Sequence, residues 1–455
     1  ELRCAHFYPS RSMTEPEIRL PVVMIPARQE GHRASPILYL PGGPGVPAGL
    51  DASGLQRWLN WADSARWPHD LVLFDPRGTG LSQPRLDCPE IRARDQANLS
   101  RSLSAAEDLR NLQQTAEACF GRLQEADFRP EDYSTPRQIR DVTELMQTLG
   151  GHDWNLYGIS YGSRLALQVL RQSPDRIRSL ILDSVYPPGV NGLISRPAQF
   201  ARAWEGLLRD CVSDADCRLQ HPRLGRDLDD LFRRLARDPV LLKIEQWPSD
   251  QVTPLLLNDY RLLWMLFLES YQPRYRPRLI PAVTAAVKGD FRPWQPIAAD
   301  YLEVWLDPDF SHAVYLSTTC AEDLPGTTDE SYQAELRRYP KLSAYMSEEW
   351  RLSPCHRWPV HALPEAMYRP VRSAVPVLLL NGRHDAATLP EWTHALLADF
   401  ANGHHFVFEG SSHAVTWENP CAMAVTWEFL RDPRDWPLPP CLSEWERGAM
   451  SPQRR

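Results

Sequence analysis

Short apolar runs alternate with amphipathic stretches in the first 190 residues of the chain and again after residue 370. The apolar runs are nearly continuous and are often followed by Gly or Asp, as strands buried on both faces of a parallel sheet tend to be. We predict seven strands, over 20–25, 37–40, 71–74, 154–157, 179–182, 375–380 and 405–408. We predict helices between them over 105–125, 135–149, 163–172, 390–400 and 422–430. This alternation implies right-handed crossovers and a mostly parallel, doubly wound α/β sheet.

The alternation stops between Pro187 and Pro370. This stretch is rich in Trp, Tyr and Arg, and its periodicity predicts helices over 197–210, 226–237, 259–269, 280–287 and 297–304. A long insertion after the 179–182 strand, followed by a return to the sheet, is the pattern of a cap domain. We therefore expect a catalytic domain formed by 1–188 and 371–455, and a helical cap over 189–370.

Size and charge narrow the class of protein. A chain of 455 residues exceeds what one simple core fills, which agrees with a core that carries an insertion. The net charge is −8, so the chain has no basic field that would attract nucleic acid or an anionic membrane. No apolar run approaches the roughly 18 to 20 residues needed to span a bilayer. We expect a peptide or small molecule as partner, and the oligomeric state stays open.

The nine cysteines favour an oxidising compartment. No C-x-x-C or H-x-x-x-H spacing suggests a metal site, so we expect none. The spacing offers four local pairs and leaves Cys4 over, but eight cysteines allow 105 connectivities, so the pairing stays open. The candidate pairs are Cys88 with Cys119, Cys211 with Cys217, Cys320 with Cys355, and Cys421 with Cys441.

The chain begins at Glu1 without a Met and without a basic-then-apolar leader. Removal of a signal peptide would account for both features. Together with the cysteines, this predicts a bacterial protein that is secreted or periplasmic.

Residues 158–162 read Gly-Ile-Ser-Tyr-Gly and stand between a predicted strand and a predicted helix. Nucleophilic chemistry needs Ser160 at the tip of a sharp strand-to-helix turn, with small residues on either side so that strand and helix approach closely. The positive end of the helix dipole then lies beneath the developing anion. A glycine-rich turn without chemistry is the alternative for the pentapeptide alone.

A serine nucleophile needs an acid and a base, which follow it in that order in a fold of this kind. Asp385 is the first carboxylate after the strand that returns from the insertion, and His413 lies in the loop after the last strand. His404 and His405 fall at the start of that strand, the wrong end of a parallel sheet for chemistry. The candidate triad is therefore Ser160, Asp385 and His413, whereas His384 is expected only to shape its loop.

A glycine-rich loop, Pro-Gly-Gly-Pro-Gly over 41–45, follows the second predicted strand. Two backbone N–H groups usually stabilise the oxyanion in such enzymes, one from the residue after the nucleophile and one from a loop of this type. We assign them to Tyr161 and Gly43, since proline cannot donate. A phosphate-binding loop is the alternative, but the Lys and Ser/Thr of a P-loop are missing.

These residues, with Asp-Pro-Arg-Gly-Thr-Gly-Leu-Ser over 75–82, resemble the prolyl iminopeptidase and tripeptidyl aminopeptidase family of α/β-hydrolase serine peptidases. The Gly-x-x-Asp-x-x-Thr pattern that contains Asp385 and Thr388 adds to the likeness. The secreted tripeptidyl branch is closer, because Pro41 stands where prolyl iminopeptidases usually have His. The chain length, the cysteines and the C-terminal segment agree with that branch. The resemblance implies an α/β-hydrolase fold and an aminopeptidase that removes N-terminal residues or short peptides, with proline-type or tripeptidyl specificity and no cofactor.

An aminopeptidase must recognise a free ammonium group, and burying that cation is costly unless an anion meets it. The family carries an acidic residue after the cysteine at 320, which makes Glu322 and its neighbour Asp323 the leading candidates, on a loop fixed by a disulfide. Glu205, Glu269 and Glu303 are rivals on predicted helices. Aromatic cap residues such as Trp264, Tyr271 and Trp305 would line an apolar pocket, or else form ordinary core.

The remaining motif residues are expected to be structural. Gly42 lets the oxyanion loop approach the nucleophile, and a buried pair between Asp75 and Arg77 holds the turn after the 71–74 strand. Thr388 braces the loop that carries Asp385, as its place in the family pattern implies. Two other functions stay open: an ester or lactone hydrolase with the same triad, and a catalytically inactive binding protein.

Overall fold

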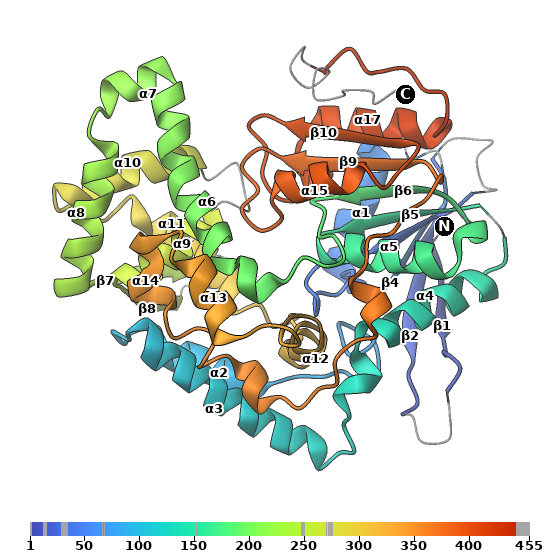
Figure 1. The fold of residues 1–455 in the computed structure, drawn as a ribbon, viewed down its shortest axis with the longest axis horizontal. Helices are drawn as coiled ribbons and strands as arrows, with labels where there is room; N and C mark the ends of the chain where they lie inside the picture. Colours follow the sequence, from blue (N-terminus) through green and yellow to red (C-terminus); the bar gives the residue numbers. More distant parts are fainter. Residues whose placement is uncertain are drawn as a thin grey trace.

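A computed structural model of the chain describes residues 2–11, 16–28, 35–65, 67, 69–151, 153–246, 251–269, 271 and 276–442. One part is an eight-stranded sheet with the strand order β1-β2-β4-β3-β5-β6-β9-β10, and a second lobe lies beside it (Figure 1). The strands are β1 Arg3–Phe7, β2 Leu20–Ile25, β3 Ile37–Leu40, β4 Leu71–Phe74, β5 Trp154–Ile159, β6 Ile177–Asp183, β9 Val377–Gly382 and β10 Gly403–Phe408.

Strands β3, β4, β5, β6, β9 and β10 run parallel, whereas β2 pairs antiparallel with both β1 and β4. In the register of the parallel strands, Ile159 lies opposite Asp183, and Asp183 lies opposite Leu380. The residues that follow β5, β6 and β9 therefore meet at one edge. The sequence pattern missed β1, because four of its five residues are exposed and no apolar run marks it.

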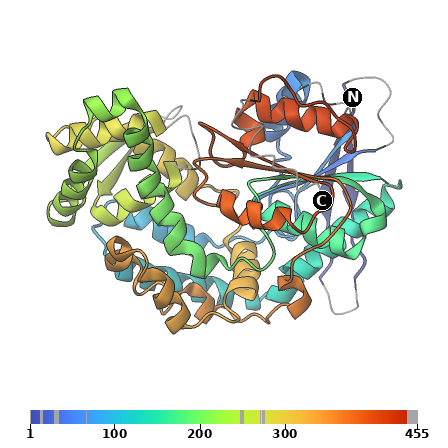
Figure 2. The same cartoon turned by 45° about the horizontal axis from the view of Figure 1, so that its top comes forward.

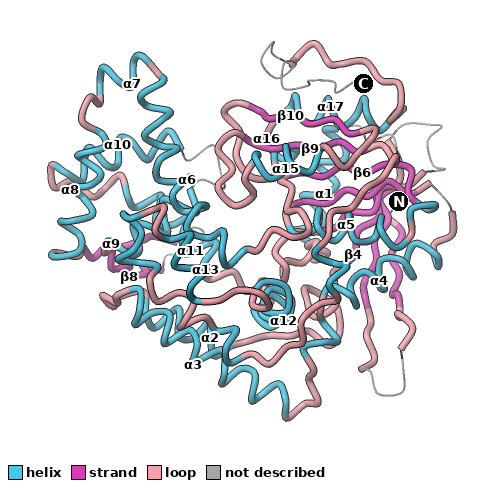
Figure 3. The backbone as a smooth tube through the Cα atoms, in the orientation of Figure 1, coloured by secondary structure: helices cyan, strands magenta, loops and turns pink. Residues whose placement is uncertain are grey.

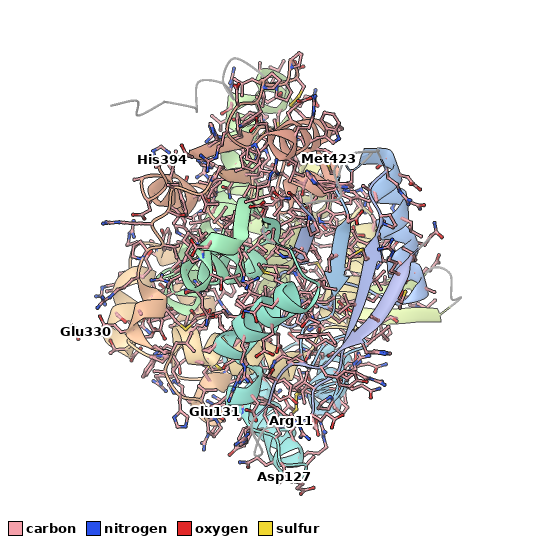
Figure 4. The ribbon with its side chains drawn as sticks, turned by 90° about the vertical axis from the view of Figure 1, so that its right-hand side faces the viewer. Arg11, Asp127, Glu131, Glu330, His394 and Met423 are labelled. Atoms are coloured by element: carbon pink, nitrogen blue, oxygen red, sulfur yellow. A yellow bond between two sulfur atoms is a disulfide. The ribbon has the colours of Figure 1, made fainter. Side chains whose placement is uncertain are left out.

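Helices cover both faces of the sheet. Alternate strand residues, such as Leu38 and Tyr39, point to opposite faces and belong to separate apolar cores. Helices α1 (Ala52–Ala65) and α17 (Pro420–Arg431) pack on one face. Helices α4 (Thr135–Thr148), α5 (Tyr161–Gln172) and α15 (Pro390–Leu397) pack on the other. Met423 on α17 and His394 on α15 accordingly lie on opposite sides of the molecule (Figure 4).

The second lobe has its own apolar core. Its helices are α6 Gly192–Ser213, α7 Ala215–Gln220, α8 Leu224–Arg237, α9 Asp259–Glu269, α10 Arg276–Val287, α11 Trp294–Trp305, α13 Asp329–Leu336 and α14 Ser343–Met346. The sequence pattern predicted helices in this stretch and missed a pair of strands. Strands β7 (Val240–Gln246) and β8 (Gln251–Leu257) form an antiparallel hairpin (Figure 3). Leu242 and Ile244 are buried while Leu241 is exposed, so the period-two pattern of a strand was present in the sequence.

Packing crosses the expected domain boundaries. Leu99, which follows α2 (Pro89–Asn98), belongs to the core of the second lobe, and its carbonyl accepts the N–H of Leu256 at 2.8 Å. Conversely, α12 (His312–Asp323) buries Val314 and Leu316 in the core beside the sheet. Helices α2, α3 (Ala105–Gln124) and α12 thus lie along the side where the two lobes join (Figure 2). The division at 188 and 371 stays a prediction.

Four disulfides cross-link the described part of the chain. Disulfides join Cys88 to Cys119, Cys211 to Cys217, Cys320 to Cys355 and Cys421 to Cys441, which are the pairs that the spacing offered; Cys4 is free and exposed. Within the described residues, no helix is both long enough and apolar enough to cross a membrane.

Short helical segments connect the larger elements. They are the 3-10 helices η1 Pro130–Tyr133, η2 Pro174–Arg176, η3 Pro340–Leu342, η4 Pro354–Arg357 and η5 Glu365–Tyr368, and the one-turn helix α16 Val415–Glu418.

Candidate active site

Ser160 occupies a strained turn between β5 and α5. Its φ is 57° and its ψ is −122°, a conformation that non-glycine residues rarely adopt. The helix begins at Tyr161, two residues before the predicted start. A Cβ on Gly162 would lie 2.0 Å from the Leu40 carbonyl oxygen, and one on Gly158 would lie 2.4 Å from the Gly162 carbonyl oxygen. Only glycine fits at these two positions, and the tight turn leaves Ser160 at the N-terminus of the helix.

Asp385 and His413 come from neighbouring strand ends and form a hydrogen-bonded pair. The Nδ1 atom of His413 lies 3.0 Å from Oδ2 of Asp385, which is fully buried. The other carboxylate oxygen accepts the N–H groups of Ala387 and Thr388, and the Thr388 hydroxyl donates to Oδ2 at 2.6 Å. The structure therefore puts Thr388 directly against the carboxylate, and four donors fix its orientation.

Backbone contacts join the loops that carry these two residues. The N–H of His384 donates to the Ser411 carbonyl at 3.0 Å, and a Cβ on Gly382 would lie 2.1 Å from the Ser412 carbonyl oxygen. The side chain of His384 pairs with Asp210 of α6 at 3.1 Å, so it links this loop to the second lobe.

The two competing histidines lie at the start of β10. His405 is buried, and its Nε2 atom lies 3.2 Å from the Asn381 side-chain oxygen. Burial lowers the pKa of His405 to about 4. His404 packs against Trp436. Both histidines therefore lie at the start of β10, whereas His413 follows its end.

Electrostatics favour an ion pair between Asp385 and His413. Burial opposes the charge on Asp385, but His413 and the Thr388 donors outweigh it, so the pKa of Asp385 lies below its ordinary value. Burial also opposes the imidazolium of His413. The carboxylates of Asp385 and then Asp183 outweigh that effect and raise the pKa of His413. The pair can accept a proton on the imidazole and stabilise it there.

The glycine loop after β3 lies against the nucleophile. A Cβ on Gly42 would lie 3.2 Å from Cβ of Ser160 and 3.8 Å from its hydroxyl oxygen. Gly43 has a φ of +102°, where a side chain would be strained. Gly45 is held by the N–H of Ser311, which donates to its carbonyl at 2.9 Å. The loop can therefore bring backbone N–H groups close to Ser160.

The expected pair between Asp75 and Arg77 is wrong. Asp75 is buried and accepts the N–H groups of Gly49 at 3.3 Å and Leu81 at 2.8 Å, so it joins the segment after the glycine-rich loop to the turn after β4. Arg77 instead donates to Asp141 of α4, with Nε 2.6 Å from Oδ2. Burial raises the pKa of Asp75 to about 6, because backbone donors alone meet its charge.

Glu322 is committed to an internal ion pair. The expected loop over 320–323 is the last turn of α12, and the Glu322 carboxylate pairs with Arg164 of α5 and accepts the Thr135 hydroxyl. Only 4% of its side chain is exposed. Asp323 accepts the N–H of Gly192 at 3.1 Å, where α6 begins. These carboxylates therefore join the helix after Ser160 to the base of the second lobe, and the ion pair with Arg164 occupies the Glu322 carboxylate.

We expect Glu322→Gln to lower the free energy of unfolding by about 3 kcal/mol, because Arg164 would remain buried without its counter-charge. Denaturant unfolding measures the loss. Glu365→Gln is the matched control, since its ion pair with Arg369 is exposed and should contribute less than about 1 kcal/mol. A stable Glu322→Gln protein that no longer prefers free N-termini would restore the ammonium-binding role.

The other expected substrate residues are spread over the second lobe. Glu205 is exposed and pairs with Arg209 on the same helix. Trp264 packs edge-to-face against Phe200 and Trp305, which makes it part of the core there. Glu269 is buried on α9, and Glu303 is exposed on α11. The structure does not bring these side chains together around Ser160.

Tyr271 is an aromatic residue that packs on the core of the second lobe and also contacts His413. Its ring lies edge-on to the imidazole of His413, with 4.8 Å between the centroids.

The sequence pattern missed three charged residues. Arg196 and Glu349 form an ion pair of 2.9 Å in the second lobe. Asp183 lies at the end of β6. Asp183 could have been predicted, because binding and catalytic residues lie at the carboxyl ends of parallel strands. A carboxylate at the end of a buried strand is therefore a candidate site residue. Among the described residues, no cluster of three or more His, Cys, Asp or Glu side chains could hold a metal ion.

Comparison with known proteins agrees with this geometry. Residues 35–420 match the family model described as the alpha/beta hydrolase fold. Serine protease Hip1 of Mycobacterium tuberculosis is 24% identical over 430 residues, covering 88% of this chain and 78% of that protein. Tripeptidyl aminopeptidase of Streptomyces lividans is 26% identical over 416 residues, covering 86% and 73%. Carboxylesterase B of M. tuberculosis is 25% identical over 437 residues, covering 91% and 81%.

The family match spans most of the chain, and the strand order, the strained serine turn and the buried Asp–His pair agree with it. The chain therefore belongs to the α/β-hydrolase fold family and is a serine hydrolase.

Proposed function

We propose that this serine hydrolase is an aminopeptidase that releases short peptides, tripeptides above all, from free N-termini. Ser160 is the nucleophile, His413 the general base and Asp385 the acid that orients it. The observation that carries the proposal is the 3.0 Å contact between His413 and the buried Asp385, at the same sheet edge as the strained Ser160 turn. Relatives named as a serine protease and a tripeptidyl aminopeptidase support the peptidase reading.

The reaction is acyl transfer. His413 takes the proton from the Ser160 hydroxyl as its oxygen attacks the scissile carbonyl carbon, and Asp385 stabilises the imidazolium. The N–H groups of Gly43 and Tyr161 stabilise the oxyanion, at about 3 to 4 kcal/mol per donor. The imidazolium then protonates the leaving amine as the C–N bond breaks. Water, deprotonated by His413, attacks the acyl-enzyme and frees the product acid and the serine.

Activity should rise with pH. The base must be neutral to act, and the carboxylates around it raise the pKa of His413 above its ordinary value of about 6.5. We therefore expect kcat/KM to increase through a midpoint above 6.5, where the imidazolium loses its proton. A simple ester is the substrate to measure, because the α-amino group of a peptide titrates near 8 itself. A midpoint below 6.5 would contradict the assignment of the base.

Ester hydrolysis is the second candidate function. The observation that favours it is the relative named carboxylesterase B, whose identity of 25% to this chain lies between those of the two peptidases. Cleavage of an ester needs the same triad but no site for an ammonium group. The commitment of Glu322 to Arg164 also removes the acid that the sequence favoured for that site.

A substrate panel separates the two functions. It consists of mono-, di- and tripeptidyl chromogenic amides, alanyl and prolyl, each with a free and an acetylated N-terminus, together with a p-nitrophenyl ester. We expect the highest kcat/KM for a tripeptidyl amide with a free N-terminus, and at least a tenfold loss on acetylation. Equal or faster cleavage of acetylated amides, or cleavage of the ester alone, would favour the esterase.

We also propose that the protein works outside the cytoplasm and that the lobe over 189–370 acts as its cap. Four disulfides support export, since such bonds persist in oxidising compartments. The contact between Tyr271 and His413 supports the cap, since it brings a residue of that lobe onto the base.

A further inference from the structure

Asp183, the last residue of β6, lies between the serine turn and the histidine loop. Its carbonyl accepts the N–H of Ser160 at 3.0 Å. Its carboxylate accepts the N–H groups of Val415 and Thr416 at 3.0 and 2.9 Å, and the Thr416 hydroxyl at 2.6 Å. One fully buried residue therefore contacts the turn of the nucleophile with its backbone and the loop after His413 with its side chain.

Ser184 extends this bridge. Its N–H donates to the Leu380 carbonyl of β9 at 2.8 Å, and its hydroxyl accepts the N–H of Ala414 at 2.7 Å and lies 3.1 Å from the Asp183 carboxylate. Asp183 and Ser184 are thus bonded to the elements that carry Ser160, Asp385 and His413.

Backbone strain gathers at the same place. Ser160, Ser184 and Ala414 have φ values of 57°, 53° and 60°, which makes three of the five non-glycine residues with positive φ among the described residues. Such conformations persist only where the surroundings hold them. The hydrogen bonds of Asp183 and Ser184 are the contacts that join these three residues.

We propose that Asp183 is a second carboxylate of this active site, a positioning residue that holds the Ser160 turn and the His413 loop in register and supplies an anion to the imidazolium. The inference rests on the proposed function, because it assigns a role relative to that triad. Its carboxylate accepts hydrogen bonds from the N–H groups of Val415 and Thr416 and from the Thr416 and Ser184 hydroxyls, a set of donors that suits the ionised form. Asp385 has its own set of hydrogen-bond donors, which includes the Thr388 hydroxyl.

The charged and titratable neighbours are few. Asp385 and the ring of Tyr271 contact His413, and the negative charge of Asp183 also raises the pKa of its imidazole. Tyr39, Tyr157 and His413 interact electrostatically with Asp183. Both tyrosines are buried and neutral in the working range, because burial raises their pKa values. Burial likewise raises the pKa of Asp183, against the Thr416 donors.

The test compares Asp183→Asn with wild type in two measurements. The first is kcat and KM on the best substrate of the panel. We expect kcat to fall at least tenfold with KM within twofold, since a misplacement of about 1 Å in such a site costs on the order of 100-fold. The second is the NMR titration of labelled His413, assigned by its loss in His413→Ala. We expect its pKa to fall when the anion is removed, because the imidazolium loses a stabilising negative charge.

Two further variants keep the test decisive. Ser184→Ala keeps the charge but loses the Ala414 contact, so we expect about a tenfold loss of kcat with the His413 pKa unchanged. Asp95→Asn removes another buried carboxylate, on α2, and should change neither quantity. Unchanged kcat or an unchanged His413 pKa in Asp183→Asn overturns the proposal. If that variant does not fold, normal kcat in Ser184→Ala overturns it.

Failure of the proposed function is distinguishable from failure of this inference. A wild-type protein that neither cleaves the panel nor reacts with a fluorophosphonate refutes the triad. The His413 titration needs no activity, so an unchanged pKa in Asp183→Asn would still overturn the role of Asp183.

Discussion

Ser160→Ala should lower kcat by about a millionfold, roughly 8 kcal/mol in the barrier, while the protein folds normally. The loss is large because alanine has no hydroxyl with which to form the acyl-enzyme. The backbone contacts that fix the turn, from the Ser160 N–H and to its carbonyl, are kept in alanine. We therefore expect the free energy of unfolding to stay within about 0.5 kcal/mol of wild type.

Turnover of the best substrate and labelling by a fluorophosphonate measure this effect together. Wild type should be labelled and Ser160→Ala should not. Ser173→Ala, at the other end of α5, is the matched control and should keep both activity and labelling. Near-normal turnover in Ser160→Ala would mean that another residue is the nucleophile.

Asp385→Asn should lower kcat by about four orders of magnitude, with the fold retained. The reason lies in the donors around the carboxylate. The N–H groups of Ala387 and Thr388 would keep the one remaining oxygen of the amide, so its NH₂ group would face Nδ1 of His413. That nitrogen must then become the acceptor, and the proton moves to Nε2. An imidazole in this tautomer cannot take the serine proton.

The pH profile distinguishes this cause from simple damage. Loss of the anion should also move the rising limb of kcat/KM to lower pH, because the imidazolium is less stable. Asp399→Asn, which only loses an exposed partner in Arg372, is the control and should keep the wild-type profile. A loss below tenfold would argue that Asp385 is not the acid of the triad.

Local patterns predicted the parts of the fold that depend on short stretches of chain. Seven strands follow from apolar runs that are buried on both faces, and β1 was missed because it has no such run. The turn around Ser160 could be predicted because Gly158 and Gly162 are required by contacts within a few residues or with the adjacent strand. The hairpin of β7 and β8 was not predicted from local patterns. Its strands alternate buried and exposed residues, but helical patterns on either side outweighed that signal.

The order of strand ends also predicted the candidate triad. Asp385 and His413 follow consecutive parallel strands, so the topology brings them to one edge whatever the rest of the chain does. The same logic extends to Asp183, which ends the strand between them and the nucleophile.

The sequence by itself therefore determined the α/β architecture, the strand-to-helix turn around Ser160 and the order of the catalytic candidates along the chain. Hydrophobic periodicity depends on residues close together in the chain, and the order of parallel strands decides which strand ends lie side by side. Only the tertiary structure decided which buried charges meet. Arg77 pairs with Asp141, 64 residues away, and Arg164 pairs with Glu322, 158 residues away. A buried charged side chain pairs with the opposite charge that tertiary packing places next to it, and no local sequence pattern predicts which residue that partner is. For this reason Glu322 could be expected to face a substrate and instead lies in an internal ion pair.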